Sequence, residues 1–174
     1  MHDLLIIEAK TPSELVAFTA LCRAYAMSLP FSLEYQGFEA EMASLPGLYA
    51  APDGVILIAK DQGMSIDAAG FNSFLGCVAV RPLPASAIHD GEPSRGCEIK
   101  RMWVDPAARS RGVGHAMMNA AIEFAKRANY GVIKLDTAPD MLAAQACYRK
   151  AGFVPAQRYN DDWDQTTMYF SMAV

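Results

Sequence analysis

Apolar and polar positions change their period within the second half of the chain. Residues 97–104 are rich in β-favouring side chains and end at Asp105-Pro106, as a strand commonly does. From Val113 onward, apolar residues recur at the spacing of one helical face. A turn with two arginines and two glycines, 109–114, separates the two segments. The pattern therefore predicts a strand, a basic turn and a helix in succession.

The first half of the chain is predicted to combine short strands with helices. A buried strand is expected at 4–9, and Thr11-Pro12-Ser13-Glu14 has the capping-box spacing that begins a helix. That helix ends at Pro30, because proline cannot continue the helical hydrogen bonding. A second short helix is expected at 33–45. Further strands are predicted at 54–59 and 74–80, and one near the other end of the chain at 166–172.

The strand predicted before the basic turn contains an irregularity. Apolar residues occupy odd positions at Cys97 and Ile99 but even positions at Met102 and Val104. A regular strand keeps one parity on its buried face. The switch predicts a β-bulge near Lys100-Arg101, which would bend the strand and free backbone groups. A strand buried on both faces is the alternative.

The basic turn has the features of an anion-binding site. The first N–H groups of a helix have no partner within the helix, and the helix dipole adds partial positive charge there. Gly112 and Gly114 leave room for a phosphate close to these amides. Arg109 and Arg111 carry guanidinium groups suited to phosphate oxygens. The turn lacks the Gly-Lys-Ser/Thr ending of a P-loop, and Met117 stands where a dinucleotide fingerprint needs its third glycine.

The spacing Arg-x-x-Gly-x-Gly at 109–114 resembles the pyrophosphate-binding motif of the GCN5-related N-acetyltransferases, which hold acetyl-coenzyme A. Residues 98–104 resemble that family's fourth strand, 134–137 its fifth, and 144–153 its last helix with the Gly-Phe that follows. The resemblance implies an α/β (α+β) fold in a single domain over 1–174. In that fold, helices flank both faces of a mixed, mostly antiparallel central sheet of six to seven strands. The family's fourth strand is bulged and splays from the fifth to admit the pantetheine arm.

The resemblance also implies where the coenzyme binds. Backbone groups around 102–104 would pair with the pantetheine and stabilise charge on the thioester carbonyl, while the turn would hold the pyrophosphate. No metal ligand is expected. The expected cofactor-binding residues are Met102, Trp103, Val104, Arg109, Ser110, Arg111, Gly112, Val113, Gly114, His115 and Ala144.

Two side chains are the candidate catalytic residues. Tyr148 lies four residues before Gly152-Phe153, where the resemblance implies a tyrosine that protonates the leaving thiolate. Packing on an amphipathic helix is its alternative role. Glu98 stands where many relatives keep a glutamate, and it would accept the proton of the incoming amine directly or through water. A charged residue on the solvent face of a strand is the alternative.

Two further features bear on ligand contacts. Met141 stands where relatives often place an asparagine that contacts the coenzyme, and methionine cannot donate that hydrogen bond. Substrate specificity is expected to come from the first two helices with their junction, 29–31, and from the loop 159–164. The aspartates and tryptophan of that loop could hold a cationic amine, and a solvated loop is the alternative.

Composition limits the class of protein. A chain of 174 residues with 52% hydrophobic and 20% charged residues is globular. The formal charge of −4 argues against nucleic acid as the main partner. Four cysteines without C-x-x-C spacing are expected to be reduced core thiols. Because neither a signal peptide nor a membrane-spanning run is recognised, a cytoplasmic location is expected, with no membrane partner.

The predicted function is an acetyl-CoA-dependent N-acetyltransferase acting on a primary amine of a small molecule or an amino-acid-like substrate. Transfer is expected to be direct, because no cysteine sits in a nucleophile context. The alternatives are acetylation of a protein N-terminus or lysine, a catalytically silent acyl-CoA-binding sensor, and a nucleotide-phosphate enzyme. Family members often form homodimers, so a homodimer is one expected assembly.

Overall fold

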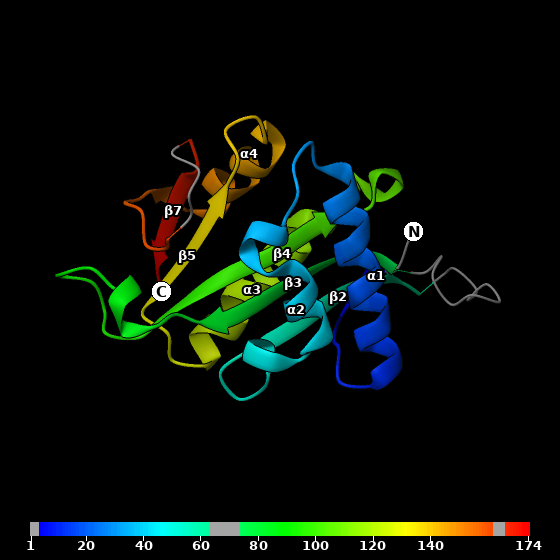
Figure 1. Ribbon diagram of the computed structural model, residues 1–174, viewed down its shortest axis with the longest axis horizontal. Helices are drawn as coiled ribbons and strands as arrows, with labels where there is room; N and C mark the ends of the chain where they lie inside the picture. Colours follow the sequence, from blue (N-terminus) through cyan, green and yellow to red (C-terminus); the bar gives the residue numbers. More distant parts are fainter. Residues whose placement is uncertain (1–3, 63–73, 162–165) are drawn as a thin grey trace.

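The computed structural model describes residues 4–62, 74–161 and 166–174, and these residues contain a seven-stranded sheet and four α-helices (Figure 1). The strands are β1 Leu4–Glu8, β2 Val55–Asp61, β3 Phe74–Pro82, β4 Gly96–Val104, β5 Val132–Thr137, β6 Val154–Pro155 and β7 Met168–Ala173. The α-helices are α1 Pro12–Ser28, α2 Phe38–Ala43, α3 Val113–Arg127 and α4 Leu142–Ala151. Short 3-10 helices lie at Glu34–Gln36, Gly47–Tyr49, Ala85–Ala87 and Pro106–Ala108.

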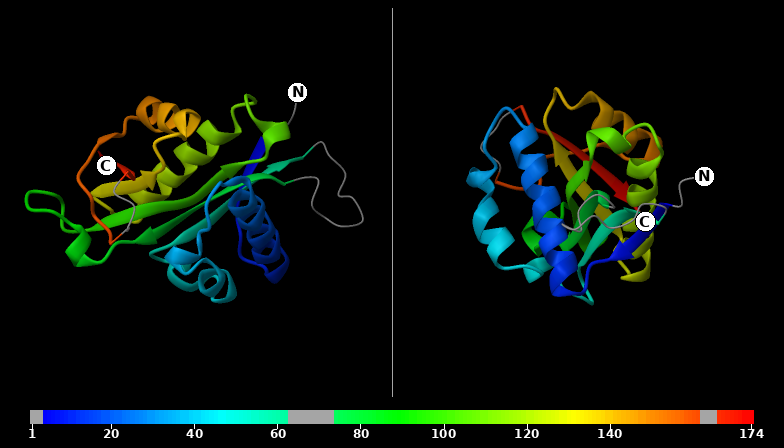
Figure 2. Two further views of the ribbon diagram at one scale, coloured as in Figure 1. Left: turned by 45° about the horizontal axis from the view of Figure 1, so that its top comes forward. Right: turned by 90° about the vertical axis from the view of Figure 1, so that its right-hand side faces the viewer.

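The strands follow the order β1-β2-β3-β4-β5-β7-β6, and each neighbouring pair is antiparallel except β4 with β5. Helices α1 and α2 cover one face of the sheet, and α3 and α4 cover the other (Figure 2). Each face buries its own apolar core. One core contains Phe18 and Ile58, and the other contains Met117 and Val78. The predicted mixed, mostly antiparallel sheet with helices on both faces is confirmed.

The start of α1 confirms the predicted capping box. The Thr11 hydroxyl accepts a hydrogen bond from the Glu14 N–H at 3.3 Å, and the Glu14 carboxylate accepts one from the Thr11 N–H at 2.8 Å. These two bonds satisfy N–H groups that the helix itself leaves unpaired. Helix α1 ends at Ser28, two residues before Pro30, which cannot continue it. The helix packs Phe18 and Cys22 into the core of its face.

The prediction of one continuous helix over 33–45 is wrong. The structure has a 3-10 turn at Glu34–Gln36 followed by α2 at Phe38–Ala43. Gly37 separates them with a φ of +69°, a left-handed conformation that glycine adopts without a steric penalty. The hydrophobic spacing is helical on both sides of this residue, so the pattern alone did not reveal the break.

The predicted bulge in β4 is confirmed. Cys77 of β3 pairs with Trp103 and Ala79 pairs with Lys100, so β4 holds one extra residue within this interval. Arg101 occupies the bulge with a φ of +56°. Pairing between β4 and β5 runs through residues 96–98, and beyond them the two strands diverge (Figure 1). The bulge therefore lies where the sheet opens.

Strand β6 was not predicted from the sequence. It has two residues and carries Pro155 at the edge of the sheet, where the missing N–H is not required. A segment this short shows no recognisable alternation of polar and apolar positions. Within the described ranges, no helix reaches both the length and the hydropathy needed to cross a bilayer.

Candidate active site

A large cavity of about 650 Å³ lies between the end of β4, the turn before α3 and the first half of α4. Cavities of this size accommodate cofactor-sized ligands. Among the described residues predicted to bind the cofactor, all except Arg111 line it. These lining residues are Met102, Trp103, Val104, Arg109, Ser110, Gly112, Val113, Gly114, His115 and Ala144. The sequence therefore identified one wall of the cavity, although binding by these residues stays a prediction.

The turn before α3 has the backbone conformation that an anion site requires. Gly112 is the N-cap of α3, and its φ of +81° is in the left-handed region that favours glycine. The N–H of Ala116 donates to the carbonyl of Gly112 at 3.0 Å, so the N–H groups of the residues before Ala116 have no partner within the helix. Val113, Gly114 and His115 line the large cavity.

The guanidinium of Arg111, which was expected to bind phosphate, pairs with a carboxylate in this structure and does not line the large cavity, so its phosphate contact stays a prediction. Its Nη2 lies 2.8 Å from a carboxylate oxygen of Asp61 in β2, and Asp61 is fully buried. A buried carboxylate requires a counter-charge, and this requirement holds the guanidinium away from the large cavity. Arg109 lines the cavity instead, with its Nε donating to the Val104 carbonyl at 3.2 Å. Of the two arginines of the turn, Arg109 is thus the one that lines the large cavity.

A smaller cavity of about 160 Å³ adjoins the large one, and Tyr25, Met102, Met141 and Tyr148 line both. Tyr148 is buried, and its ring packs against those of Phe153 and Phe170. Burial raises the pKa of the Tyr148 hydroxyl well above its usual value. Tyr148 therefore packs in the core and also lines both cavities, and its role as a proton donor stays a prediction.

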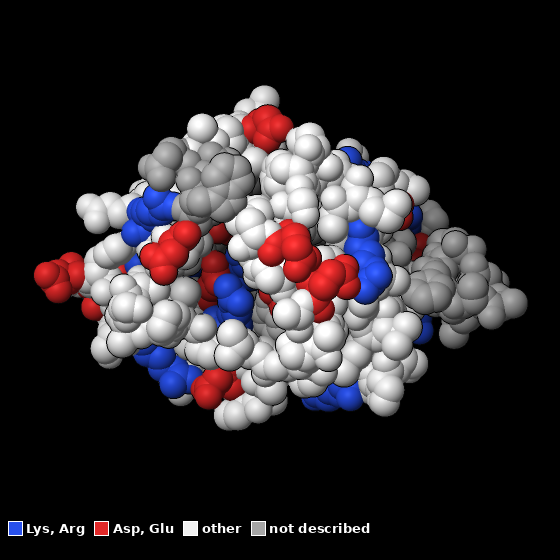
Figure 3. All heavy atoms as spheres, in the orientation of Figure 1, with Lys and Arg blue, Asp and Glu red and all other residues white. Residues whose placement is uncertain are grey.

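Acidic and basic side chains meet at the small cavity, and the space-filling view shows both kinds adjacent near the centre of this face (Figure 3). Lys100 of β4 and Asp136 of β5 line the cavity from the two strands that diverge. The Lys100 Nζ is 3.5 Å from Asp136 Oδ1, and the other oxygen of Asp136 accepts a hydrogen bond from the Asn160 amide at 2.9 Å. The pair spans the opening between the strands.

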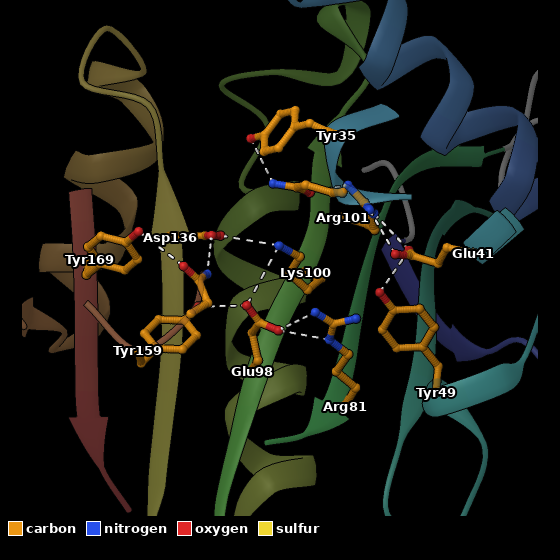
Figure 4. Close-up of polar contacts among 12 residues, drawn as sticks. Tyr35, Glu41, Tyr49, Arg81, Glu98, Lys100, Arg101, Asp136, Tyr159 and Tyr169 are labelled. Carbon is orange, nitrogen blue, oxygen red and sulfur yellow. Dashed lines mark hydrogen bonds and ion pairs between the residues drawn. The ribbon is translucent and has the colours of Figure 1, made fainter. Parts of the chain in front are cut away.

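Glu98 is buried rather than on a solvent face, so that alternative is wrong. One of its oxygens accepts hydrogen bonds from Arg81 at 2.8 Å, and the other accepts one from the Tyr159 hydroxyl at 2.7 Å (Figure 4). Burial and the Glu98 charge raise the pKa of Tyr159 well above its usual value. Among the described residues that line the two cavities, Glu98 is absent. Both oxygens are engaged, which disfavours Glu98 as a direct proton acceptor.

A second buried ion pair lies on the other side of the bulge. Arg101 donates two hydrogen bonds of 2.8 Å to Glu41 of α2, and the Tyr49 hydroxyl donates to Glu41 at 2.9 Å. Burial opposes the charged form of Glu41, but the hydrogen bonds and charge of Arg101 outweigh it and lower the pKa of Glu41. Arg101 is therefore a structural cation at the bulge.

Sequence reasoning did not select Tyr25, Lys100 or Asp136 as site residues, although all three line the small cavity. The sequence did contain a signal that could have singled out Lys100, because it lies where the apolar residues of β4 change from odd to even positions. Asp136 has no comparable signal, because a lone acidic residue near a strand end is usually solvated.

Met141 and the loop 159–164 were also expected to bear on ligand contacts. Met141 is the N-cap of α4, lines both cavities and makes no side-chain capping hydrogen bond. Of the loop, Tyr159, Asn160 and Asp161 are described. Asp162, Trp163 and Asp164 lie outside the described residues, so the predicted cation contact of the tryptophan stays a prediction.

Comparison with known proteins gives a consistent result. The profile described as "Acetyltransferase (GNAT) family" matches residues 18–153. An uncharacterized N-acetyltransferase of Schizosaccharomyces pombe is 29% identical over 154 residues, which cover 88% of this chain and 85% of that protein. The N-acetylaspartate synthetase of Danio rerio is 28% identical over 145 residues, which cover 78% of this chain and 50% of that protein.

Solved structures share the fold. A chain of the NatC complex bound to Gag peptide and CoA superposes with a TM-score of 0.71, covering 99% of each chain at 15% identity. At this identity the likeness concerns the fold alone. The family match spans the bulged strand, the basic turn and Tyr148, which line the large cavity. The chain belongs to the acetyltransferase (GNAT) family.

Proposed function

We propose that the protein moves an acetyl group directly from acetyl-CoA to the primary amine of a small, amino-acid-like molecule. The observation that carries this proposal is the junction of the two cavities at Met102 and Tyr148. One cavity is large enough for a coenzyme, and the other is small and lined by both charged and apolar side chains. The relative named N-acetylaspartate synthetase supports an amino-acid-like acceptor.

The residues of the large cavity fit acetyl-CoA. The N–H groups of residues 113–115 and the Arg109 guanidinium would hold the pyrophosphate. Backbone groups of Met102 to Val104, on the part of β4 beyond its pairing with β5, would hold the pantetheine and stabilise the developing oxyanion. When bound, acetyl-CoA supplies the thioester that the acceptor nitrogen attacks. The acceptor ammonium would first lose one proton to solvent and attack as the neutral amine. As the C–N bond forms and the C–S bond breaks, the sulfur would take a proton from Tyr148, and the second proton lost by the nitrogen would restore it.

We assign Tyr148 as the donor of the proton that the leaving sulfur takes up. Because burial raises the pKa of its hydroxyl, Tyr148 keeps its proton at neutral pH and acts as a hydrogen-bond donor. A thiolate expelled into the same buried space is also disfavoured as an anion, so its own proton affinity rises with that of the donor. Because burial raises the pKa of both groups, the difference between the pKa of the tyrosine and that of the thiol changes little.

The contacts on the acceptor side favour different roles for two carboxylates. Asp136 lines the small cavity and is assigned the hydrogen bond from the acceptor amine. Glu98 as the base stays a prediction, and its contacts support a positioning role in which it holds Arg81 and Tyr159. Cys147 lines the large cavity, but burial raises the pKa of its thiol, which favours the unreactive form and hence direct transfer.

The test is release of free thiol from acetyl-CoA across a panel of primary amines, with wild type and Tyr148→Phe. We expect turnover with at least one amino acid and a loss of kcat of about 10²-fold or more in Tyr148→Phe. Tyr130→Phe is the matched control, because its hydroxyl donates to the Asp53 carbonyl outside both cavities. Unchanged kcat in Tyr148→Phe would remove Tyr148 from this role.

The second candidate function is acetylation of a protein N-terminus, favoured by the structural similarity to a complex bound to a peptide and CoA. Turnover on peptides but on no free amino acid would select it. Tight acetyl-CoA binding without turnover on any amine would select the catalytically silent sensor instead. A cytoplasmic location and a homodimer stay predictions.

A further inference from the structure

Three cations, Arg81, Lys100 and Arg101, lie around the acceptor side of the site, and carboxylates hold them to different degrees. Arg81 is 2.8 Å from Glu98, and Arg101 makes two contacts of 2.8 Å with Glu41. These are the lengths of ordinary charge-assisted hydrogen bonds. The carboxylate oxygens paired with Lys100 lie farther away, at 3.5 and 3.7 Å.

Lys100 and Asp136 are nevertheless nine-tenths buried. Their side chains are 8% and 10% exposed, and they project from β4 and β5 across the opening between these strands (Figure 4). A buried ammonium with three N–H donors is costly unless short hydrogen bonds satisfy it. The long contacts leave donor capacity on Lys100 directed at the small cavity, which both residues line.

We propose that the acceptor is a zwitterionic α-amino acid, whose carboxylate binds Lys100 and whose amine binds Asp136. The proposal rests on the N-acetyltransferase function given above and names its substrate class. The amine and the carboxylate of such a molecule sit on one carbon, at a separation comparable to that between Lys100 Nζ and Asp136 Oδ1. The four charges then alternate, and each gains an opposite neighbour at hydrogen-bond distance.

Other amines do not complete this arrangement. A peptide N-terminus presents an amine followed by a neutral amide, and an alkylamine has no second charge. Either one would leave Lys100 buried without a short charged partner. Arg81 and Arg101 do not substitute for Lys100, because Glu98 and Glu41 already neutralise them at short distance.

The position of Asp136 agrees with delivery of the amine to the reacting centre. Its charge contributes to the raised pKa of Tyr148, after burial and the neighbouring Tyr25 and Cys147, so the carboxylate lies within electrostatic reach of that hydroxyl. An amine held by Asp136 is therefore near the junction of the two cavities, where the proposed acetyl transfer takes place.

The experiment compares free amino acids with their α-amides, which keep the amine and the side chain but lose the carboxylate charge. The twenty common L-amino acids are screened by thiol release and by calorimetry with the CoA-loaded protein. The best ligand and its α-amide are then measured with wild type, Lys100→Met, Asp136→Asn and the control Lys126→Met. Lys126 is an exposed lysine of α3 that pairs with Glu123, so the control removes a lysine charge away from both cavities.

We expect the free acid to exceed its amide in kcat/KM and in affinity by at least about tenfold in wild type and in Lys126→Met. Lys100→Met should bring the acid-to-amide ratio of kcat/KM close to one, mainly through a higher KM for the acid, while acetyl-CoA still binds. Asp136→Asn should weaken acid and amide alike and preserve their ratio.

An amide that equals or exceeds the acid in wild type, or a preference for the acid that survives Lys100→Met, would overturn the proposal. So would a failure of every free amino acid to bind the CoA-loaded protein. Binding of the acid that depends on Lys100, without thiol release on any amine, would instead contradict the proposed acetyl transfer and leave the amino-acid site standing.

Discussion

The guanidinium of Arg101 and the carboxylate of Glu41 form a two-bond ion pair, with Nε and Nη2 each 2.8 Å from a carboxylate oxygen. Arg101 occupies the bulge of β4 in a left-handed conformation, and Glu41 lies in α2. A third guanidinium nitrogen of Arg101 donates to the Gln36 side chain at 3.2 Å. The helical layer on that face of the sheet therefore holds the bulge, next to which β4 and β5 diverge.

Removing the charge of Glu41 should destabilise the protein strongly. In Glu41→Gln the Arg101 side chain, which is 2% exposed, keeps its charge but loses its carboxylate partner. Breaking a buried ion pair from one side costs about 3–5 kcal/mol. Urea unfolding of Glu41→Gln against wild type measures this loss, with Glu39→Gln as control because the Glu39–Arg23 pair is exposed. Equal loss in both variants would contradict a special role for the buried pair.

The stabilisation by Glu41 should depend on pH in a defined direction. The pKa of Glu41 in the folded protein is lowered from 4.5, so the unfolded chain binds its proton at higher pH than the folded chain does. The stabilisation by the Glu41 charge is fully present above pH 4.5, and it is lost as the pH falls through the pKa of Glu41 in the folded protein. The difference in unfolding free energy between wild type and Glu41→Gln should therefore shrink on acidification below 4.5. Unfolding curves across this range test it, and a difference that grows on acidification would contradict it.

The two glycines of the basic turn should respond differently to alanine. Gly112 has a φ of +81°, so Gly112→Ala strains the backbone and should cost about 1 kcal/mol of unfolding free energy. Gly114 is inside α3, and an added Cβ would be 3.6 Å from Val104, an ordinary contact. Gly114→Ala should keep or raise stability by up to about 1 kcal/mol, because alanine favours helices over glycine. Thermal unfolding of the pair of variants compares them, and equal losses would contradict the assigned backbone roles.

Local residue patterns located most of the helices and strands, whereas the architecture of the sheet, which buries an apolar core on each face, followed from the family resemblance. The capping box of α1 and the bulge of β4 were both visible as residue patterns, at Thr11-Glu14 and at the parity switch near Lys100. The break at Gly37 was not visible, because one left-handed glycine interrupts a helix without changing the apolar spacing on either side.

The candidate site was only partly predictable for a related reason. Backbone contributions of the turn follow from local sequence, so nearly all predicted turn residues line the large cavity. Side-chain partners depend on strands distant in sequence. The Arg111–Asp61 pair joins residues fifty positions apart, and the Glu98–Tyr159 bond joins residues sixty-one apart. No local pattern identifies such partners, which is why the guanidinium of Arg111 was assigned to a phosphate.

The two arginines of the turn should therefore separate ligand binding from stability. Arg109 lines the large cavity and is otherwise exposed, so Arg109→Met should weaken acetyl-CoA binding, by about tenfold, with little change in stability. Arg111 pairs with the fully buried Asp61, so Arg111→Met should lower the unfolding free energy by about 1–3 kcal/mol. It should leave the affinity for acetyl-CoA nearly unchanged at temperatures where the variant stays folded. Calorimetry measures the acetyl-CoA affinity of each variant, and urea unfolding measures its unfolding free energy. A loss of acetyl-CoA affinity in Arg111→Met as large as that in Arg109→Met would show that the Asp61 pair opens to let Arg111 reach the phosphate.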